Sequence, residues 1–169
     1  MPFDLDKIEF LNMLNEVTEA YTSIILEHQD PTGPFPATGQ DAYEYSDFRW
    51  VRDSSYTTLG LIYKLQSASE TESEILMDAI EKNFEWWFNI IDVEEEGLEY
   101  LISTESISAT EFYEKALPAR FTREGLREPT SEFAEDNWPN VQLDGYGTLL
   151  VVFGKYVEQT NRTNLVESY

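Results

Sequence analysis

The stretch "FRWVRDSSYTTLGL", residues 48–61, places Arg52 and Asp53 between Trp50 and a run of apolar residues that recur at helical spacing. Charged side chains rarely occupy the start of a buried helix unless a partner or a ligand needs them there. The pair therefore indicates two features together: a helix that begins just after it, and a polar site at that end of the helix.

Four helical segments separated by loops follow from the rest of the chain. Three prolines and two glycines between residues 29 and 41 exclude regular structure there. Elsewhere, apolar spacing and favourable capping residues predict helices over about 6–28, from Ser54 or Ser55 through Leu65, from Ser69 or Thr71 to about 91, and over about 143–159. The predicted fold class is therefore all-α.

The helices alternate in character, which predicts two layers. The first and third are amphipathic, whereas the second and fourth are more apolar. We expect the odd-numbered helices to be outer and the even-numbered ones inner, so that the N-termini of the inner helices share one rim. Before the fourth helix we expect irregular chain with a short β-hairpin, in which "LEYLIST" (98–104) pairs with "ARFT" (119–122).

The shared rim would gather residues suited to a sugar. An indole stacks on the C–H face of a sugar ring, a carboxylate accepts hydrogen bonds from adjacent hydroxyls, and Arg offers a fork of donors. A plainer alternative is that the Arg–Asp pair is a structural ion pair, that the tryptophans pack in the core, and that the residues before the fourth helix only cap it. The residues of the predicted site are Trp50, Arg52, Asp53, Trp138, Gln142 and Asp144.

The charge of the chain limits its partners. There are 11 Lys and Arg residues against 33 Asp and Glu residues, which gives a formal net charge of −22. Such a surface repels phosphate backbones and anionic lipid, so we exclude nucleic acid and membranes as partners. The acidic residues are spread along the chain, which favours adaptation to a salt-rich cytoplasm over a local acidic surface for a partner. Both interpretations stay open.

The residue inventory excludes several kinds of chemistry. The chain has no cysteine, which rules out disulfides and thiolate sites, and its single histidine argues against a His-rich metal site or a His-based triad. Its longest apolar run, "LLVVF", is too short to cross a bilayer, and the N-terminus lacks the pattern of a signal peptide. We expect a cytoplasmic protein with no cofactor and no bound metal ion.

Two segments together resemble a known family. "HQDPTGPFPATGQDAYEYSDFRWVRDSSY" (28–56) resembles the start of the catalytic domain in glycoside hydrolase family 15, the glucoamylases, glucodextranases and related trehalases. "LPARFTREGLREPTSEFAEDNWPNVQLDGYGTLL" (117–150) is similar to a later segment of that family, in which a Trp precedes "Q.DG" by four residues. The two motifs occur in the family's order.

The resemblance implies a fold and a set of roles. The family fold is a toroid of six inner and six outer helices, of which residues 1–169 would form about four, as a single incomplete segment. The Arg–Asp pair would hold the hydroxyls of the terminal glucose of an α-linked glucan, and the tryptophans would line the cleft. The residues implied are Trp50, Arg52, Asp53 and Trp138 for substrate binding, with Tyr45, Gln142 and Asp144 supporting the rim.

The family's catalytic carboxylates have no counterpart in this sequence. Family members are inverting hydrolases, in which one glutamic acid protonates the leaving oxygen and a second glutamate activates water. The acid lies well beyond the "Q.DG" segment in a Trp-Glu-Glu context, whereas this sequence runs only 25 residues past Asp144 and contains no "WEE". We interpret "EEE" (94–96) as a solvated loop, and we expect the chain alone to be inactive.

Two other hypotheses remain at this point. The chain could be a non-catalytic family member whose exposed edge binds a glucan or binds a complementary chain that supplies the rest of the toroid. It could also be a plain acidic helical domain whose motif matches are accidental. A fold that sends Arg52 and Gln142 to opposite ends would favour this last hypothesis.

Overall fold

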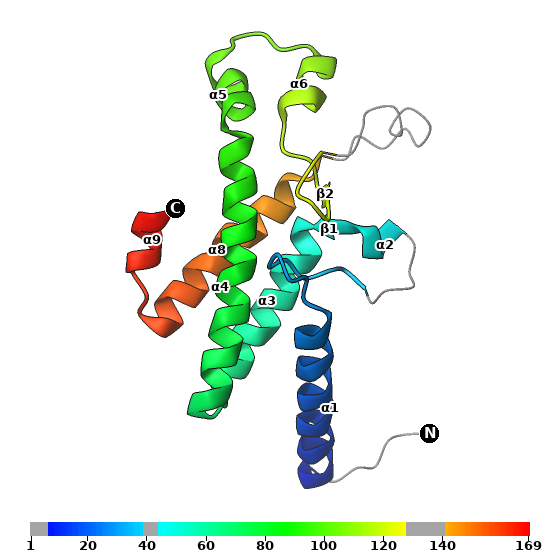
Figure 1. Cartoon of the computed structure of the whole chain (residues 1–169), viewed down its shortest axis with the longest axis vertical. Coiled ribbons are helices and arrows are strands. Elements are labelled where there is room, and N and C mark those ends of the chain that lie inside the picture. The colour runs from blue at the N-terminus through cyan, green and yellow to red at the C-terminus, as the bar shows by residue number, and fades with distance from the viewer. Residues whose placement is uncertain (1–6, 39–43, 128–140) are drawn as a thin grey trace.

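The computed structural model describes residues 7–38, 44–127 and 141–169, and these are mostly helical (Figure 1). The all-α prediction is therefore confirmed at the level of fold class. In chain order, the elements are α1 (Lys7–His28), α2 (Glu44–Asp47), β1 (Phe48–Trp50), α3 (Val51–Leu65), α4 (Glu70–Val93), α5 (Glu95–Ser103), α6 (Ala109–Lys115), β2 (Arg120–Thr122), α8 (Leu143–Thr160) and α9 (Asn164–Ser168).

Helices α3 and α8, far apart in the sequence, lie side by side and parallel. At their starts, Gly145 of α8 packs so closely on Val51 that an added Cβ atom would come within 2.4 Å of the valine Cγ1. Toward their ends, the Gln159 side chain donates a hydrogen bond to the Ile62 carbonyl at 2.8 Å. The helices that the sequence predicts as inner are therefore neighbours along most of their length.

Helix α4 runs antiparallel to α3 and packs on both α3 and α8. Near its end the Trp87 indole donates to Ser54 at 3.0 Å, and near its start Glu72 lies 3.0 Å from Lys64, at the far end of α3. The core between the three helices is apolar and aromatic, as hydrophobic burial requires. Its fully buried members include Val51, Leu61, Ile62, Leu76, Ile80, Phe84, Trp87, Leu149, Val152 and Tyr156.

The predicted start of α3 at Ser54 or Ser55 is wrong. The helix begins at Val51, with Trp50 in the N-cap position and no side-chain cap. Both serines lie inside the helix and are buried, where Ser55 donates to the Val51 carbonyl and Ser54 donates to Asn83 of α4. These hydroxyls are satisfied by the preceding turn and by a neighbouring helix, so no helix end is needed to explain them.

The start of α4 confirms one of the two predicted caps. Ser69 accepts a hydrogen bond from the Glu72 amide, and the Glu72 side chain accepts one from the Ser69 amide, which completes a capping box. Thr71 lies inside the helix. The bounds of α1 and α8 also agree with the predicted helices to within one or two residues.

The region before α8 differs from its prediction. The "LEYLIST" segment forms most of α5, and α6 follows it, so this part of the chain is not irregular. The "ARFT" segment does contain a strand, β2, but its partner is β1, in antiparallel register with Arg120 opposite Trp50. The hairpin prediction is therefore wrong, because β2 pairs with a strand about seventy residues earlier rather than with a local one.

Helix α1 has the predicted bounds but buries little of its apolar surface. It extends away from α3, α4 and α8 (Figure 1), and its main polar link to them is Lys64, whose buried ammonium contacts Glu19 at 2.6 Å. Thr22, Ile25 and Leu26 face the core. A second apolar stripe is 41–63% exposed, and it comprises Phe10, Met13, Leu14, Val17, Tyr21 and Ile24.

Candidate functional site

The starts of α3 and α8 lie together, and this junction is called the rim below. The close packing of Gly145 on Val51 brings the first turns of the two helices together. Across this junction Arg52 Nη1 lies 3.7 Å from Asp144 Oδ2. The structure therefore joins a residue of the first motif to a residue of the second, about ninety positions later.

This rim pair is open to solvent. The side chains of Arg52 and Asp144 are 46% and 64% exposed, and an ion pair in such a setting contributes between roughly 0 and 1 kcal/mol. A ligand hydroxyl can replace either partner at little cost. The guanidinium donors and the carboxylate acceptor are therefore available for recognition rather than committed to the fold.

The other predicted residues differ in their settings. Asp53 is half-buried in the first turn of α3, and Gln142 is the half-buried N-cap residue of α8, although its side chain forms no capping hydrogen bond. Trp50 is only 8% exposed, so it offers little surface to a ligand. Tyr45 belongs to the short helix α2, but its side chain lies outside the described part of the structure, as does all of Trp138.

Sequence reasoning missed Arg120, which lies against the rim tryptophan. Its guanidinium carbon is 5.0 Å from the ring centroid of Trp50 and 4.3 Å from that of Phe48. The arginine is 7% exposed and comes from β2. Only the register of β1 on β2 brings these side chains together, and no local pattern in the sequence reveals a pairing of this range.

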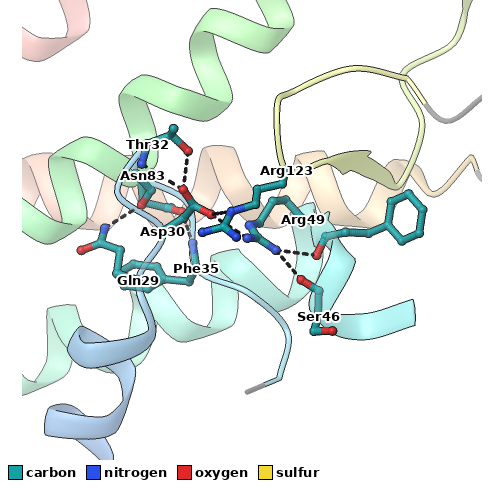
Figure 2. A network of polar contacts seen from close by, with 10 residues as sticks. Gln29, Asp30, Thr32, Phe35, Ser46, Arg49, Asn83 and Arg123 are labelled. Carbon is teal, nitrogen blue, oxygen red and sulfur yellow. Dashed lines mark hydrogen bonds and ion pairs between the residues drawn. The ribbon is translucent and has the colours of Figure 1, made fainter. Parts of the chain in front are cut away.

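A second missed feature is a buried anchor around Asp30 (Figure 2). One oxygen of this carboxylate accepts from the amide and hydroxyl of Thr32, and the other accepts from Arg49 at 2.7 Å and Arg123 at 2.5 Å. The anchor thus joins the loop after α1, strand β1 and the turn after β2. "DPTG" is a turn signature in which Asp bonds the backbone two residues on, but the two arginines could not be paired from sequence.

The charge of Asp30 is stabilised despite its burial, with 2% of the side chain exposed. Burial raises the pKa of this carboxyl, but hydrogen bonds from the Thr32 amide and hydroxyl and from Arg49 and Arg123 outweigh it and lower the pKa from 3.8 to about 2. The carboxylate is therefore ionised at any physiological pH. This cluster holds the chain in place, and its carboxylate is saturated by its own partners.

A groove of about 570 Å³ opens beside the anchor. It is lined by the end of α1, the loop after it and residues around the start of β1, and the lining is mostly polar. Of the predicted site residues whose side chains the structure describes (Trp50, Arg52, Asp53, Gln142 and Asp144), none lines it. The groove and the rim of α3 and α8 are therefore separate features.

The "EEE" segment is only partly the solvated loop that the sequence predicts. Glu95 and Glu96 are exposed in the first turn of α5. Glu94, however, forms a bidentate ion pair with Arg127, with 16% of its side chain exposed. This carboxylate is engaged in a structural contact between the α4–α5 junction and the segment after β2.

Comparisons with known proteins give no match: no family model, no curated protein and no solved structure is significantly similar to this chain. Among the described residues, none of the helices combines the length and the apolar character needed to cross a membrane.

Proposed function

We propose that this chain is a glucoamylase-like segment that binds the terminal glucose units of an α-linked glucan at the rim formed by the starts of α3 and α8. The observation that carries the proposal is the contact between Arg52 and Asp144. Two motifs that resemble those of glycoside hydrolase family 15 lie at the same end of two parallel helices. An accidental resemblance gives no reason for this juxtaposition.

The chemistry of the rim suits neutral polyhydroxylated ligands. Arg52 offers a half-exposed planar fork of donors, Asp144 of α8 offers an acceptor 3.7 Å away, and Asp53 is the next residue of α3. In the proposal Trp50, two residues before Arg52, is the first aromatic contact. In the proposal Trp138 is the second aromatic contact, and Tyr45 and Gln142 support the rim.

The arrangement of the helices supports a toroid segment. In such a fold inner helices are parallel neighbours, and each is joined to an antiparallel outer helix. Helices α3 and α8 have the first relationship, and α3 and α4 have the second. We propose that α1 is another outer helix, and that its exposed apolar stripe is covered by further toroid helices or by a complementary chain.

We predict that the 169-residue chain releases no glucose from maltooligosaccharides, because none of its residues corresponds to the family's paired catalytic glutamates. The measurement is a glucose assay on purified chain after prolonged incubation, with a commercial glucoamylase as the positive control. Release of glucose that is abolished by Asp53→Ala would contradict the prediction and assign catalysis to this chain.

Binding is tested separately by isothermal titration with maltose. We expect saturable heat from the wild type and at least a tenfold loss of affinity in Arg52→Ala, about the 1.4 kcal/mol of one charged hydrogen bond. Lys82→Ala is the matched control, because Lys82 is an equally exposed cation paired with Asp78 on α4, away from the rim. Absence of maltose heat in the wild type, or equal losses in both variants, would reject the proposed site.

A non-catalytic member of the same family is the second candidate. The large apolar side chains left exposed on α1 and α8, such as Val17, Leu150 and Val151, favour a chain that assembles with a partner. Maltose binding without glucose release fits both candidates. If glucose release appears when a second chain that supplies the glutamates is added, the first candidate, a segment of a hydrolase, is identified.

A further inference from the structure

Arg120 is placed to hold the aromatic side of the rim. Trp50 and Phe48 are two residues apart on β1, so their side chains share one face of the strand, and Arg120 lies on that face directly opposite Trp50. The guanidinium carbon is within 5.0 Å of both ring centroids and is buried. The intervening residue, Arg49, points to the other face and binds Asp30.

The strand pair transmits this hold to the start of α3. Beyond the three paired residues, the Val51 amide donates to the Ala119 carbonyl at 3.1 Å, so the ladder continues into the first residue of the helix. The backbone of Trp50 is thereby held by β2, and its ring contacts the side chain of Arg120, which belongs to β2. Arg52 follows two residues later.

We propose that Arg120 is the positioning residue of the rim, whose guanidinium fixes the Trp50 ring beside Arg52 and Asp53. This inference deepens the proposed function and rests on it for the identity of the ligand. A planar guanidinium stacks on an aromatic ring and is held by the ring's negative face, most strongly when both are desolvated. Lysine keeps the charge but loses the plane, and leucine loses both.

The test compares Arg120→Leu and Arg120→Lys with a matched control, Arg123→Leu. Arg123 lies in the same segment and is 60% exposed, and it contacts Asp30 rather than the rings, so its loss weakens the strand pair without touching Trp50. Each of these proteins is also prepared with the additional substitution Trp50→Phe. Subtracting the fluorescence of the protein with Trp50→Phe from that of the same protein without it gives the signal of Trp50 alone. Urea midpoints verify that every chain is folded under the conditions used.

Two readouts are taken, acrylamide quenching of Trp50 and maltose affinity. In Arg120→Leu we expect quenching to rise about twofold or more as the ring loosens, and maltose affinity to fall about fivefold, which corresponds to roughly 1 kcal/mol of cation–π contact. Arg120→Lys should restore most of both values. Arg123→Leu should change the urea midpoint but neither readout.

The outcomes separate the two proposals. Unchanged quenching in Arg120→Leu, or the same increase in Arg123→Leu, overturns the positioning role. Increased quenching with unchanged maltose affinity would show that Arg120 fixes the Trp50 ring without affecting ligand binding. This result also overturns the positioning role. If the wild type binds no maltose, the proposed function fails, and quenching alone decides whether Arg120 fixes Trp50.

Discussion

Two ion pairs of the same residue types differ in whether their carboxylate is free to accept a further hydrogen bond. Asp30 is buried, and each of its oxygens accepts two hydrogen bonds, so no capacity is left for a ligand. Asp144 is exposed and lies 3.7 Å from Arg52, a contact that water or a hydroxyl can replace. Both are Asp–Arg pairs, but only the buried and saturated one is committed to the fold.

Asp30 gives a prediction with a defined pH window. Its pKa is about 2 in the folded protein against 3.8 for an ordinary Asp carboxyl, so its stabilisation is essentially complete above about pH 5 and is lost as the pH falls toward 2. The shift corresponds to about 2 kcal/mol. We therefore expect the free energy of unfolding to fall less between pH 6 and pH 3 in Asp30→Asn than in the wild type.

The measurement is urea unfolding at the two pH values. At pH 6 Asp30→Asn should already be destabilised by about 3 kcal/mol, because the buried guanidinium of Arg49 loses its charge partner and Arg123 loses its contact as well. Asp78→Asn is the control, since that carboxylate is exposed in an i,i+4 pair, and it should change stability by less than about 0.5 kcal/mol. Equal effects from the two variants would show that Asp30 is not an anchor.

At the scale of elements, the pairing of α3 with α8 is what assembles the rim. The contact depends on a glycine, because Gly145 leaves no side chain between the first turns of the two helices. Along α8 the buried apolar residues recur every three or four positions between exposed ones, so the helical spacing predicts an amphipathic helix. It does not predict which neighbour the apolar side meets.

Gly145→Ala should therefore separate the two helix starts. The added methyl group would come within 2.4 Å of Val51 Cγ1, and we expect a loss of about 1–3 kcal/mol in the free energy of unfolding together with weaker maltose binding. Gly147→Ala is the matched control in the same helix, because nothing lies within 4 Å of its added Cβ. There the lower chain entropy of the unfolded state should stabilise by about 0.5–1 kcal/mol. Equal stabilisation in both variants would contradict the close packing.

At the scale of the whole molecule, exposed apolar surface coexists with a net charge of −22. The exposed stripe of α1, from Phe10 to Ile24, is apolar, whereas a helix face that contacts only water is normally polar. Mutual repulsion opposes association of these chains at low ionic strength, and salt screens it. Adaptation to a salt-rich cytoplasm remains a prediction from composition.

We expect the chain to associate as salt is raised, through α1. Light scattering at about 0.1 M and 2 M KCl should show a mass that increases with salt in the wild type and increases less in the double variant Phe10→Ser, Val17→Ser. Both side chains are more than 40% exposed, so stability should change by less than about 0.5 kcal/mol. Ile25→Ser is the control, because Ile25 packs on the core and its loss should destabilise the fold without reducing association. Association that is independent of the Phe10 and Val17 substitutions would place the contact elsewhere.

The sequence by itself predicted the bounds of two long helices and the start of a third. Apolar spacing predicted α1 and α8 almost to the residue, and the Ser69–Glu72 capping box predicted the start of α4, because these features depend on residues at most four positions apart. The grouping of both motifs at one rim also followed from the alternation of helix character. Trp138, part of the same prediction, lies outside the described residues.

Only the tertiary structure decided which distant partners meet. Ser54 resembles a helix cap until Asn83 is seen beside it, and "ARFT" resembles half of a local hairpin until β1 is found as its partner. The Asp30 anchor and the stacking of Arg120 on Trp50 join residues that are tens of positions apart. Such contacts depend on how the helices pack, and packing is set by the shape of the whole core rather than by any local pattern.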